Sequence, residues 1–405
     1  MDKVELDKDQ KEAFDKLSRL KVGAAFMDMG TGKTLTAFAL VASTDVELCL
    51  WVCPLSVSDD IYAEYKKWGY SFPLEVVGYE SLSQSDRIYY DLLRRLQGKK
   101  VFCVADESLF IKNGKAIRTK RMFEIGRHCE YKLILNGTPV IKNYIDLWAQ
   151  MEFLSPRILN MTFNKFRDDY AEYYVRGKLK GFIRKYHNID HLMKLIAPYV
   201  YACNLNIDIK EYYYDYYYEN ERYDECQEIK TTTLQSGGSV DMKALFTLLQ
   251  RQYTQSESRN GIINEITSTG GQFIIYCKFL DNIKGENKIT GEVDKEERKR
   301  IRKRFANGEF NQLWITYGCG SFGLNLQFCN NIIFADQEFN YGKKVQAAYR
   351  IKRKGQGKPV NYYNLWCRTG LENLIKSNNE KKKNMLTTVK KALMEIGERK
   401  FIESL

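Results

Sequence analysis

The stretch that decides the fold is Val22–Leu40, which reads VGAAFMDMGTGKTLTAFAL. Its apolar start predicts a buried strand, and the apolar run after Lys33 predicts a helix. Between them, Gly30 and Gly32 let backbone N–H groups wrap a phosphate at the helix N-terminus. Lys33 can reach the β- and γ-phosphates, and the Thr34 hydroxyl can ligate Mg²⁺. The short form G-x-G-K-T is less specific than the full phosphate-loop pattern, but its strand–loop–helix context predicts a nucleotide-binding domain.

Further apolar runs alternate with amphipathic segments and fall into two sets. The first set continues at 47–52, 74–77, 101–105 and 132–136, and the second lies at 271–277, 312–317, 331–335 and 360–366. Strands that alternate with helices predict parallel sheets covered on both faces. The chain is therefore predicted to be α/β, with two parallel-sheet lobes at 1–154 and 268–405 and a helical, tyrosine-rich insertion and linker at 155–267.

The tyrosine-rich run EYYYDYYYENERYDE at 211–225 has two interpretations. Tyrosines can stack on nucleic-acid bases, but the acids between them would repel phosphates. A strand followed by a helix that faces the core is the favoured interpretation. For DKEERKRIRKRF at 294–305, the acids placed before the basic residues favour an exposed, salt-bridged helix over direct phosphate contact.

Composition limits the function classes. The chain has 405 residues, with 63 basic against 51 acidic residues and a net charge of +12, which favours a polyanionic partner without establishing one. Its three histidines make a histidine-based metal or triad site unexpected, and His187 and His191 have no third ligand nearby in sequence. The ten cysteines form no C-x-x-C pair, which indicates reduced thiols in a cytosolic setting. The charged N-terminus and the absence of a long apolar run predict a soluble protein without a signal peptide or membrane partner.

Paired acids end another predicted strand, in VFCVADESLFIKN at 101–113. There Asp106 would hold Mg²⁺ through water, and Glu107 would orient or deprotonate an attacking water. In the second lobe, Arg350 and Arg353 are three residues apart, which predicts one helix face, and they are placed like arginine fingers that deliver positive charge to a γ-phosphate.

Taken in order, these blocks resemble the Swi/Snf-type DNA translocases of helicase superfamily two over nearly the whole chain. In the first lobe the resemblance rests on LDKDQKEAF (6–14), MGTGKT (29–34), CPLSVSDDIYAEYKKW (53–68), VVGYESL (76–82), DESLFIKN (106–113) and LNGTP (135–139). In the second it rests on QFIIYCKF (272–279), ITGEVDKEERKRIRKRF (289–305), TYGCGSFGLNLQ (316–327), FADQEFNYGKKVQAAYRIKRKGQ (334–356) and KPVNYYNLWCRTGLE (358–372). It implies two RecA-like lobes with ATP bound between them and nucleic acid lying across both.

The resemblance also implies roles for the residues that match its motifs. Gln10 is expected to read adenine, with Met29, Gly30, Thr31, Gly32, Lys33, Thr34, Gly323 and Gln346 as further ATP-binding candidates. Catalysis is expected from Lys33, Asp106, Glu107, Arg350 and Arg353, with Mg²⁺ at Thr34 and Asp106. Coupling is expected from Asn136 and Thr138. The nucleic-acid track is expected at Ser56, Tyr79, Lys112, Asn113, Lys278, Thr316 and Asn325.

The chain departs from the family pattern at several positions. Leu109 stands where a histidine couples hydrolysis to the LNGTP block, and Asn136 stands where threonine or serine is usual. Tyr341 replaces a proline, and Lys352 replaces a histidine between the two arginines. None of these removes a phosphate, magnesium or finger residue, so the departures concern coupling to DNA rather than hydrolysis.

The resulting expectation is an ATP- and Mg²⁺-dependent translocase on double-stranded DNA that remodels DNA or protein–DNA complexes. Single-stranded DNA or RNA is a less favoured track. The alternatives are a strand-separating DNA or RNA helicase and a nucleotide-gated DNA clamp with little turnover. Because the motifs fill the chain, a protein partner is expected to supply target specificity. We further expect a monomeric cytoplasmic protein of prokaryotic or phage origin.

Overall fold

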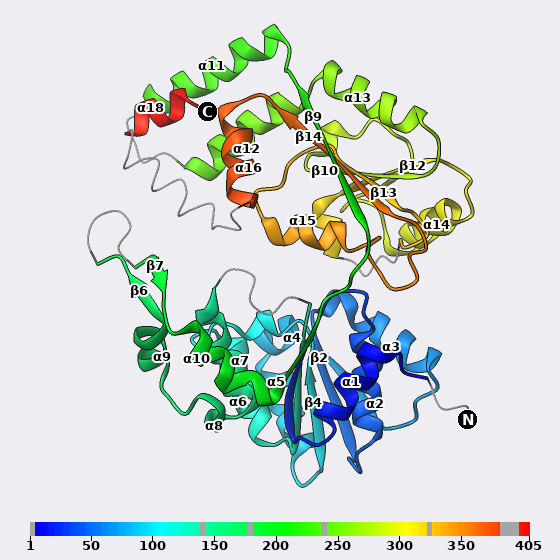
Figure 1. Cartoon of the computed structure of the whole chain (residues 1–405), viewed down its shortest axis with the longest axis vertical. Coiled ribbons are helices and arrows are strands. Elements are labelled where there is room, and N and C mark those ends of the chain that lie inside the picture. Colours follow the sequence, from blue (N-terminus) through cyan, green and yellow to red (C-terminus); the bar gives the residue numbers. More distant parts are fainter. Residues whose placement is uncertain (1–4, 138–142, 176–180, 236–240, 322–325, 381–396) are drawn as a thin grey trace. The chain divides into compact units, whose positions relative to one another are not determined.

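The computed structural model describes residues 5–137, 143–175, 181–235, 241–321, 326–380 and 397–405. The chain divides into two compact units, the first ending at Leu205 and the second beginning at Asn206. Each unit is an α/β domain built on its own six-stranded sheet (Figure 1). Among the described residues, no helix has the length and apolar character needed to cross a membrane.

In the first unit all neighbouring strands pair in parallel, in the order β3-β2-β4-β5-β1-β8. Their bounds are β1 Val22–Met27, β2 Leu48–Cys53, β3 Leu74–Gly78, β4 Val101–Ala105, β5 Tyr131–Asn136 and β8 Val200–Cys203. Strands β1, β2 and β4 are apolar along their whole length, as expected where helices cover both faces of the sheet.

One face of this sheet packs on α1 Lys8–Leu17, α2 Lys33–Ala42 and α3 Ser58–Lys67. The opposite face packs on a larger group of helices: α4 Tyr79–Gln84, α5 Asp86–Leu96, α6 Ile117–Arg127, α7 Leu147–Leu154, α8 Pro156–Leu159, α9 Phe163–Tyr170 and α10 Ile189–Ile196. A small antiparallel pair, β6 Ala171–Tyr173 and β7 Ile183–Tyr186, projects from this second layer (Figure 1).

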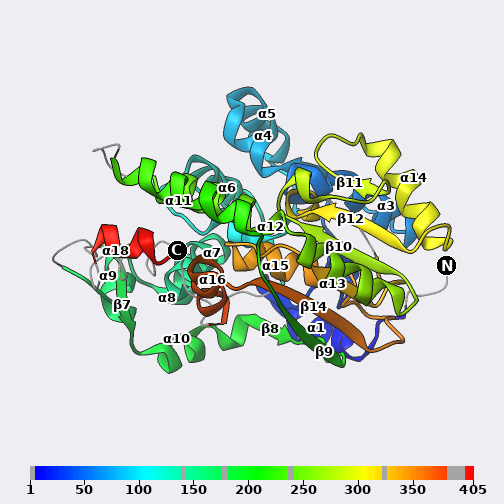
Figure 2. The same cartoon turned by 90° about the horizontal axis from the view of Figure 1, so that it is seen from above.

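The second unit repeats the design, with parallel strands in the order β11-β12-β10-β13-β14-β9. Their bounds are β9 Ile209–Tyr216, β10 Phe273–Cys277, β11 Lys288–Ile289, β12 Gln312–Thr316, β13 Asn331–Phe334 and β14 Val360–Cys367. One face carries α11 Asn220–Gln235, α12 Met242–Thr254, α13 Glu257–Ser268, α16 Gly370–Glu380 and α18 Glu398–Glu403. The other face carries α14 Lys295–Ala306 and α15 Tyr341–Ala348, and Figure 2 shows these layers from above.

Both predicted sets of strands are confirmed, and so is a strand followed by a helix in the tyrosine-rich run, as β9 and α11. The segment 155–267, predicted to be a helical insertion and linker, is divided between the two units. Its part up to Leu205 packs with the first unit, where β8 pairs with β1, and its part from Asn206 packs with the second, where β9 pairs with β14. Each sheet gains an edge strand from this segment, and this pairing is a long-range contact that local sequence patterns do not reveal.

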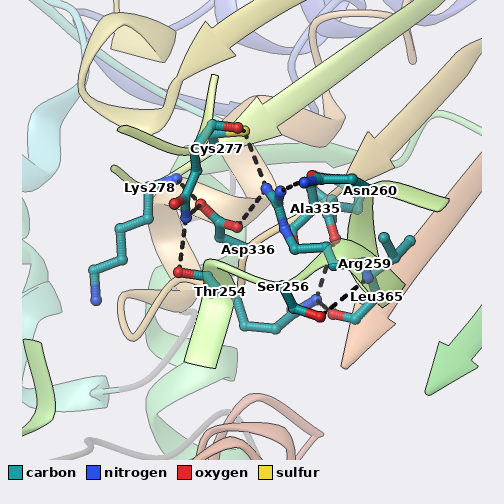
Figure 3. Close-up of polar contacts among 12 residues, drawn as sticks. Thr254, Ser256, Arg259, Asn260, Cys277, Lys278, Ala335, Asp336 and Leu365 are labelled. Atoms are coloured by element: carbon teal, nitrogen blue, oxygen red, sulfur yellow. Dashed lines mark hydrogen bonds and ion pairs between the residues drawn. The ribbon is translucent and has the colours of Figure 1, made fainter. Parts of the chain in front are cut away.

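A buried ion pair ties α13 to the end of β13 in the second unit. Arg259 donates to the Asp336 carboxylate at 2.7 Å, and the two side chains are 1% and 0% exposed. Arg259 also donates to the carbonyl oxygen of Ala335, and the second carboxylate oxygen of Asp336 accepts from the backbone N–H of Lys278 at 2.8 Å and from Asn282 at 2.9 Å (Figure 3). The ion pair therefore joins α13, β10 and β13.

A second buried polar group lies beside this pair. Gln250 donates to the Glu372 carboxylate at 2.7 Å and accepts from the Lys278 ammonium at 2.6 Å. Burial raises the pKa of Glu372 to about 8 and lowers the pKa of Lys278 to about 8. Burial thus favours the neutral forms of both groups.

Arg259→Ala is expected to lower the free energy of unfolding of the second unit by about 3–5 kcal/mol, because it leaves the buried Asp336 carboxylate without its cation. Hydrogen–deuterium exchange of the β10 and β13 amides would measure this. Arg300→Ala is the matched control, since Arg300 pairs with Glu297 on an exposed helix face, and it should change stability by less than about 0.5 kcal/mol. Equal effects of the two substitutions would show that the buried pair does not hold the unit together.

Glu372 makes stability depend on pH. Its carboxyl group has an ordinary pKa of 4.5 and a folded pKa of about 8, so between these values the folded state binds the extra proton. Stability from this group is present at low pH and is lost as pH rises toward 8, by up to about 1.4 kcal/mol per pH unit. Urea unfolding at several pH values, followed by tryptophan fluorescence, should show a shallower fall for Glu372→Gln than for the wild type. Glu297→Gln, at an exposed site, should leave the slope unchanged; identical slopes for all three proteins would contradict the prediction.

Candidate functional site

The phosphate-binding loop lies between β1 and α2, as the sequence predicts. Gly30 and Gly32 both have φ of +84°, in the left-handed region that favours glycine. Lys33 opens α2, and its ammonium turns back over the loop to donate to the carbonyl oxygens of Met27 at 2.9 Å and Asp28 at 3.3 Å. The loop is therefore built with its lysine folded over it.

Gln10 lies against this loop, although it comes from α1. Its side chain is buried and donates to the carbonyl oxygen of Thr31 at 3.2 Å. A Cβ atom on Gly32 would lie 2.0 Å from the Gln10 amide nitrogen, so a larger residue at position 32 would displace it. A capping box with Asp7 fixes the start of α1 and with it the position of Gln10.

The paired acids follow β4. Burial, followed by the neighbouring Glu107 carboxylate, raises the pKa of Asp106 to about 7, while the positive charge of Lys33 opposes this shift. Glu107 has φ of +50°, a left-handed conformation that costs a non-glycine residue about 1–3 kcal/mol. The backbone N–H of Glu107 donates to the Asp106 carboxylate at 2.9 Å, which orients this carboxylate.

Tyr79 is a sequence-predicted nucleic-acid contact, but its side chain is fully buried. Its hydroxyl donates to the carbonyl oxygen of Asp106 at 2.9 Å, and its ring stacks on Phe110 at a centroid distance of 5.3 Å. In this structure Tyr79 therefore supports the acidic turn from behind and does not face a ligand in solvent.

The end of β5 completes this group of residues. A Cβ atom on Gly137 would lie 3.0 Å from Met29 Cγ and 3.8 Å from Lys33 Nζ, so the backbone just after β5 lies against the phosphate loop. Asn136 is buried and donates to the Ser108 hydroxyl at 3.4 Å. Thr138, predicted to act with Asn136, lies outside the described residues. The ends of β1, β4 and β5 thus bring the loop, the acids and Asn136 together.

Three further nucleic-acid candidates of the first unit are exposed. Ser56 lies in the turn after β2. Lys112 forms an ion pair with Asp146 at 3.3 Å, and Asn113 accepts from the backbone N–H of Lys115 at 3.0 Å. All three follow the carboxyl ends of parallel strands.

The second-unit candidates are less accessible. The Lys278 ammonium donates to Gln250 and lies 3.3 Å from the centre of the Phe339 ring. Thr316 is buried at the end of β12. Both side chains would have to move to contact nucleic acid. Asn325 and Gly323 lie outside the described residues.

Arg350 and Arg353 do not share a helix face, contrary to the sequence-based prediction. Helix α15 ends at Ala348, and both arginines lie in the turn that follows. Hydrogen bonds hold this turn against residues 326–329. The Arg350 carbonyl oxygen accepts from the backbone N–H of Leu326 at 3.3 Å, and Gln356 donates to the carbonyl oxygens of residues 327 and 329. Arg350 is buried and Arg353 half-buried, whereas Gln346 is exposed on α15.

The basic helix α14 matches the favoured salt-bridged interpretation, because Lys299, Arg300 and Arg304 each pair with a glutamate. No group of three or more His, Cys, Asp or Glu side chains within the described ranges is arranged to hold a metal ion. His191 contacts the Tyr170 hydroxyl at 2.9 Å instead.

ATP with Mg²⁺ fits the residues at the β1, β4 and β5 ends. The two left-handed glycines leave the loop backbone open to a phosphate, and Asp106 is an oxygen donor of the kind that Mg²⁺ prefers.

Sequence reasoning missed three buried polar residues: Gln150, which bonds to Ser108, and the ion pair of Arg259 with Asp336. Asp336 follows an apolar strand just as Asp106 does, and this parallel could have identified it.

Two protein-family models match the chain. A model described as SNF2-related domain matches residues 63–211, and one described as helicase conserved C-terminal domain matches residues 257–355. Together they cover more than half of the chain. A solved structure titled Sulfolobus solfataricus SWI2/SNF2 ATPase core in complex with dsDNA shares 20% identity, covers 100% of this chain and 97% of its own, and has a TM-score of 0.45.

Similar curated proteins come mostly from eukaryotes. The TATA-binding protein-associated factor mot1 of Aspergillus fumigatus is 26% identical over 86% of this chain and 24% of its own length. The chromodomain-helicase-DNA-binding protein 1-like of Danio rerio is 23% identical over 89% and 41%. An uncharacterized ATP-dependent helicase of Mycoplasma pneumoniae is 25% identical over 89% and 39%.

The chain spans about a quarter of the length of the mot1 relatives. The expected prokaryotic or phage origin has no support in this mostly eukaryotic set. The two successive domain matches, together with the two parallel-sheet units, place the chain in the Snf2-type ATPases of helicase superfamily two, a family of ATP hydrolases.

Proposed function

We propose that the chain is an ATP- and Mg²⁺-dependent motor that moves along double-stranded DNA. The observation that carries the proposal is the convergence of Lys33, Asp106 and Gly137 at the ends of β1, β4 and β5. The Lys33 charge lowers the pKa of Asp106 against its burial, and Gly137 touches the loop that carries Lys33. A phosphate-binding lysine together with a carboxylate that can hold Mg²⁺ is a recurring arrangement in phosphoryl-transfer sites.

In this proposal the chain's own residues divide the work. The N-terminus of α2 and Lys33 bind the phosphates, and the Thr34 hydroxyl and Asp106 hold the metal ion, which neutralises charge on the β- and γ-phosphates. Glu107, whose backbone is left-handed, is proposed to orient the attacking water. Arg350 and Arg353 are proposed to supply positive charge to the γ-phosphate.

Duplex DNA is the proposed track. The family, the DNA-binding name of the zebrafish relative and the net charge of +12 support it. The exposed Ser56, Lys112 and Asn113 are the proposed contacts in the first unit. A protein partner is proposed to direct the motor to its target, and the relatives named TATA-binding protein-associated factor support this.

The test is the ATPase rate without nucleic acid and with single-stranded DNA, duplex DNA or RNA. Duplex DNA should stimulate turnover most. Lys33→Ala should reduce turnover by about 10²-fold or more, because the transferred phosphoryl group loses a lysine that stabilises its negative charge. Lys99→Ala is the control, since Lys99 is exposed in the turn before β4 at the opposite edge of the sheet. Equal stimulation by RNA would reject the DNA track. A duplex-unwinding assay and a triplex-displacement assay separate the two motor types, because strand separation without triplex displacement would favour a helicase.

Tyr79→Phe separates a supporting role from a DNA contact. It removes the hydroxyl bond to the carbonyl oxygen of Asp106 and leaves the ring stacked on Phe110. Turnover with saturating duplex should fall by about two- to tenfold, in line with the loss of one buried hydrogen bond. The affinity for duplex, measured by fluorescence anisotropy without ATP, should stay at the wild-type value. Weaker duplex binding with unchanged turnover would instead place Tyr79 in the track.

A further inference from the structure

A chain of buried hydrogen bonds links the acidic turn to helix α7. Asn136 donates to the Ser108 hydroxyl at 3.4 Å, Ser108 donates to the Gln150 side-chain oxygen at 2.7 Å, and Gln150 donates to the carbonyl oxygen of Asp146 at 2.9 Å. Ser108 and Gln150 are 0% exposed and Asn136 is 2% exposed. A buried network with satisfied members holds its parts in fixed relative positions.

A buried glutamine in an apolar helix is explained by its part in this hydrogen-bond network. Helix α7 reads LWAQMEFL, and Gln150 is fully buried among apolar neighbours. A buried amide is costly unless it is hydrogen-bonded, and Ser108 together with Asp146 provides both of the bonds found. The glutamine and the serine therefore form a matched pair.

This hydrogen-bond network contains residues next to two functionally different groups. Ser108 directly follows Glu107, the residue with the left-handed backbone. At the other end, the Asp146 carboxylate pairs with Lys112 at 3.3 Å, and the Lys112 side chain is 52% exposed. Within one unit, a path of hydrogen bonds and covalent bonds thus runs from the residue next to the proposed water-orienting acid to a solvent-facing lysine.

We propose that Ser108 and Gln150 are positioning residues that transmit engagement of Lys112 by a DNA phosphate to Glu107. This inference rests on the proposed function and assigns coupling to a route that does not pass through Leu109. Leu109 has no polar side-chain atom, whereas its neighbour Ser108 bonds to Asn136 directly.

The coupling has a physical cause at Asp146. Burial raises the pKa of this carboxyl group, and the positive charge of Lys112 opposes the shift. When a phosphate attracts Lys112, the half-buried Asp146 carboxylate loses its paired cation. The loss of this ion pair favours movement of the turn at the start of α7. Gln150 would follow this movement, because it donates to the carbonyl oxygen of Asp146 in that turn.

The experiment measures the ATPase rate of the full chain with and without duplex DNA. Gln150→Leu should reduce the stimulation factor by about fivefold, within the range of coupling energies along such networks. Its basal turnover and its KM for ATP should stay within about twofold of the wild type, a split that a damaged nucleotide site would not produce. Ser108→Ala should reduce the stimulation factor to the same extent.

The double variant Ser108→Ala/Gln150→Leu separates coupling from packing. Replacing both partners by apolar groups removes the Gln150 amide that Ser108→Ala alone would leave without its donor, while Asn136 loses its acceptor in both proteins. The double variant should therefore be at least as thermally stable as Ser108→Ala alone. Its stimulation factor should remain as low as in the single variants. Recovery of stimulation in the double variant would overturn the proposal and leave Gln150 a purely structural residue.

Thr119→Val is the matched control, because Thr119 is buried on α6 of the same unit and outside the hydrogen-bonded chain. Its stimulation factor should equal that of the wild type. A wild-type chain that duplex DNA does not stimulate would overturn the proposed function and this inference with it. A stimulated wild type with an equally stimulated Gln150→Leu would overturn the inference alone.

Discussion

Parallel pairing of every strand in both six-stranded sheets is the constraint on which the rest of the structure depends. In a parallel sheet all carboxyl ends lie at one edge, so the loops that follow the strands are neighbours regardless of their distance in sequence. β5 lies between β1 and β4, which brings Lys33 and Asp106 within electrostatic reach although 73 positions separate their numbers. The same geometry in the second unit places Asp336, after β13, beside the start of the loop after β10.

Buried polar groups distinguish the two edges chemically. In the first unit, desolvation raises the pKa of Asp106, and the charge of Lys33, which is hydrogen-bonded to the loop itself, opposes this rise. This leaves a carboxyl group whose ionisation responds to any cation placed beside it. In the second unit, the Arg259–Asp336 pair is fully enclosed and bonded on every side, which suits a structural anchor. Similar strand-end acids thus serve different purposes because their partners differ.

Much of the fold could be predicted from sequence because the signals are local. Apolar, β-branched or aromatic runs such as VFCVA and FIIYC favour buried strands, and the left-handed backbone of the phosphate loop favours glycine at positions 30 and 32. What could not be predicted depends on long-range packing. The pairing of β8 with β1, the inward turn of Tyr79 and the end of α15 at Ala348 are each set by residues distant in sequence. Arg259 illustrates the limit, since an arginine in a helix that begins ESRN appears exposed until Asp336 is placed beside it.

The acidic turn shows how a local departure from a family pattern can mislead. At sequence level, Leu109 seems to remove the link between the acids and Asn136, because only that position is compared. In the folded chain the side chain that reaches Asn136 belongs to Ser108, and its other partner, Gln150, comes from a helix 42 residues further along. A hydrogen bond needs a donor and an acceptor at the right distance, and it does not need them at a particular position of a motif. Polarity lost at one residue of a turn can therefore be supplied by its neighbour, provided that the packed helix offers a matching side chain.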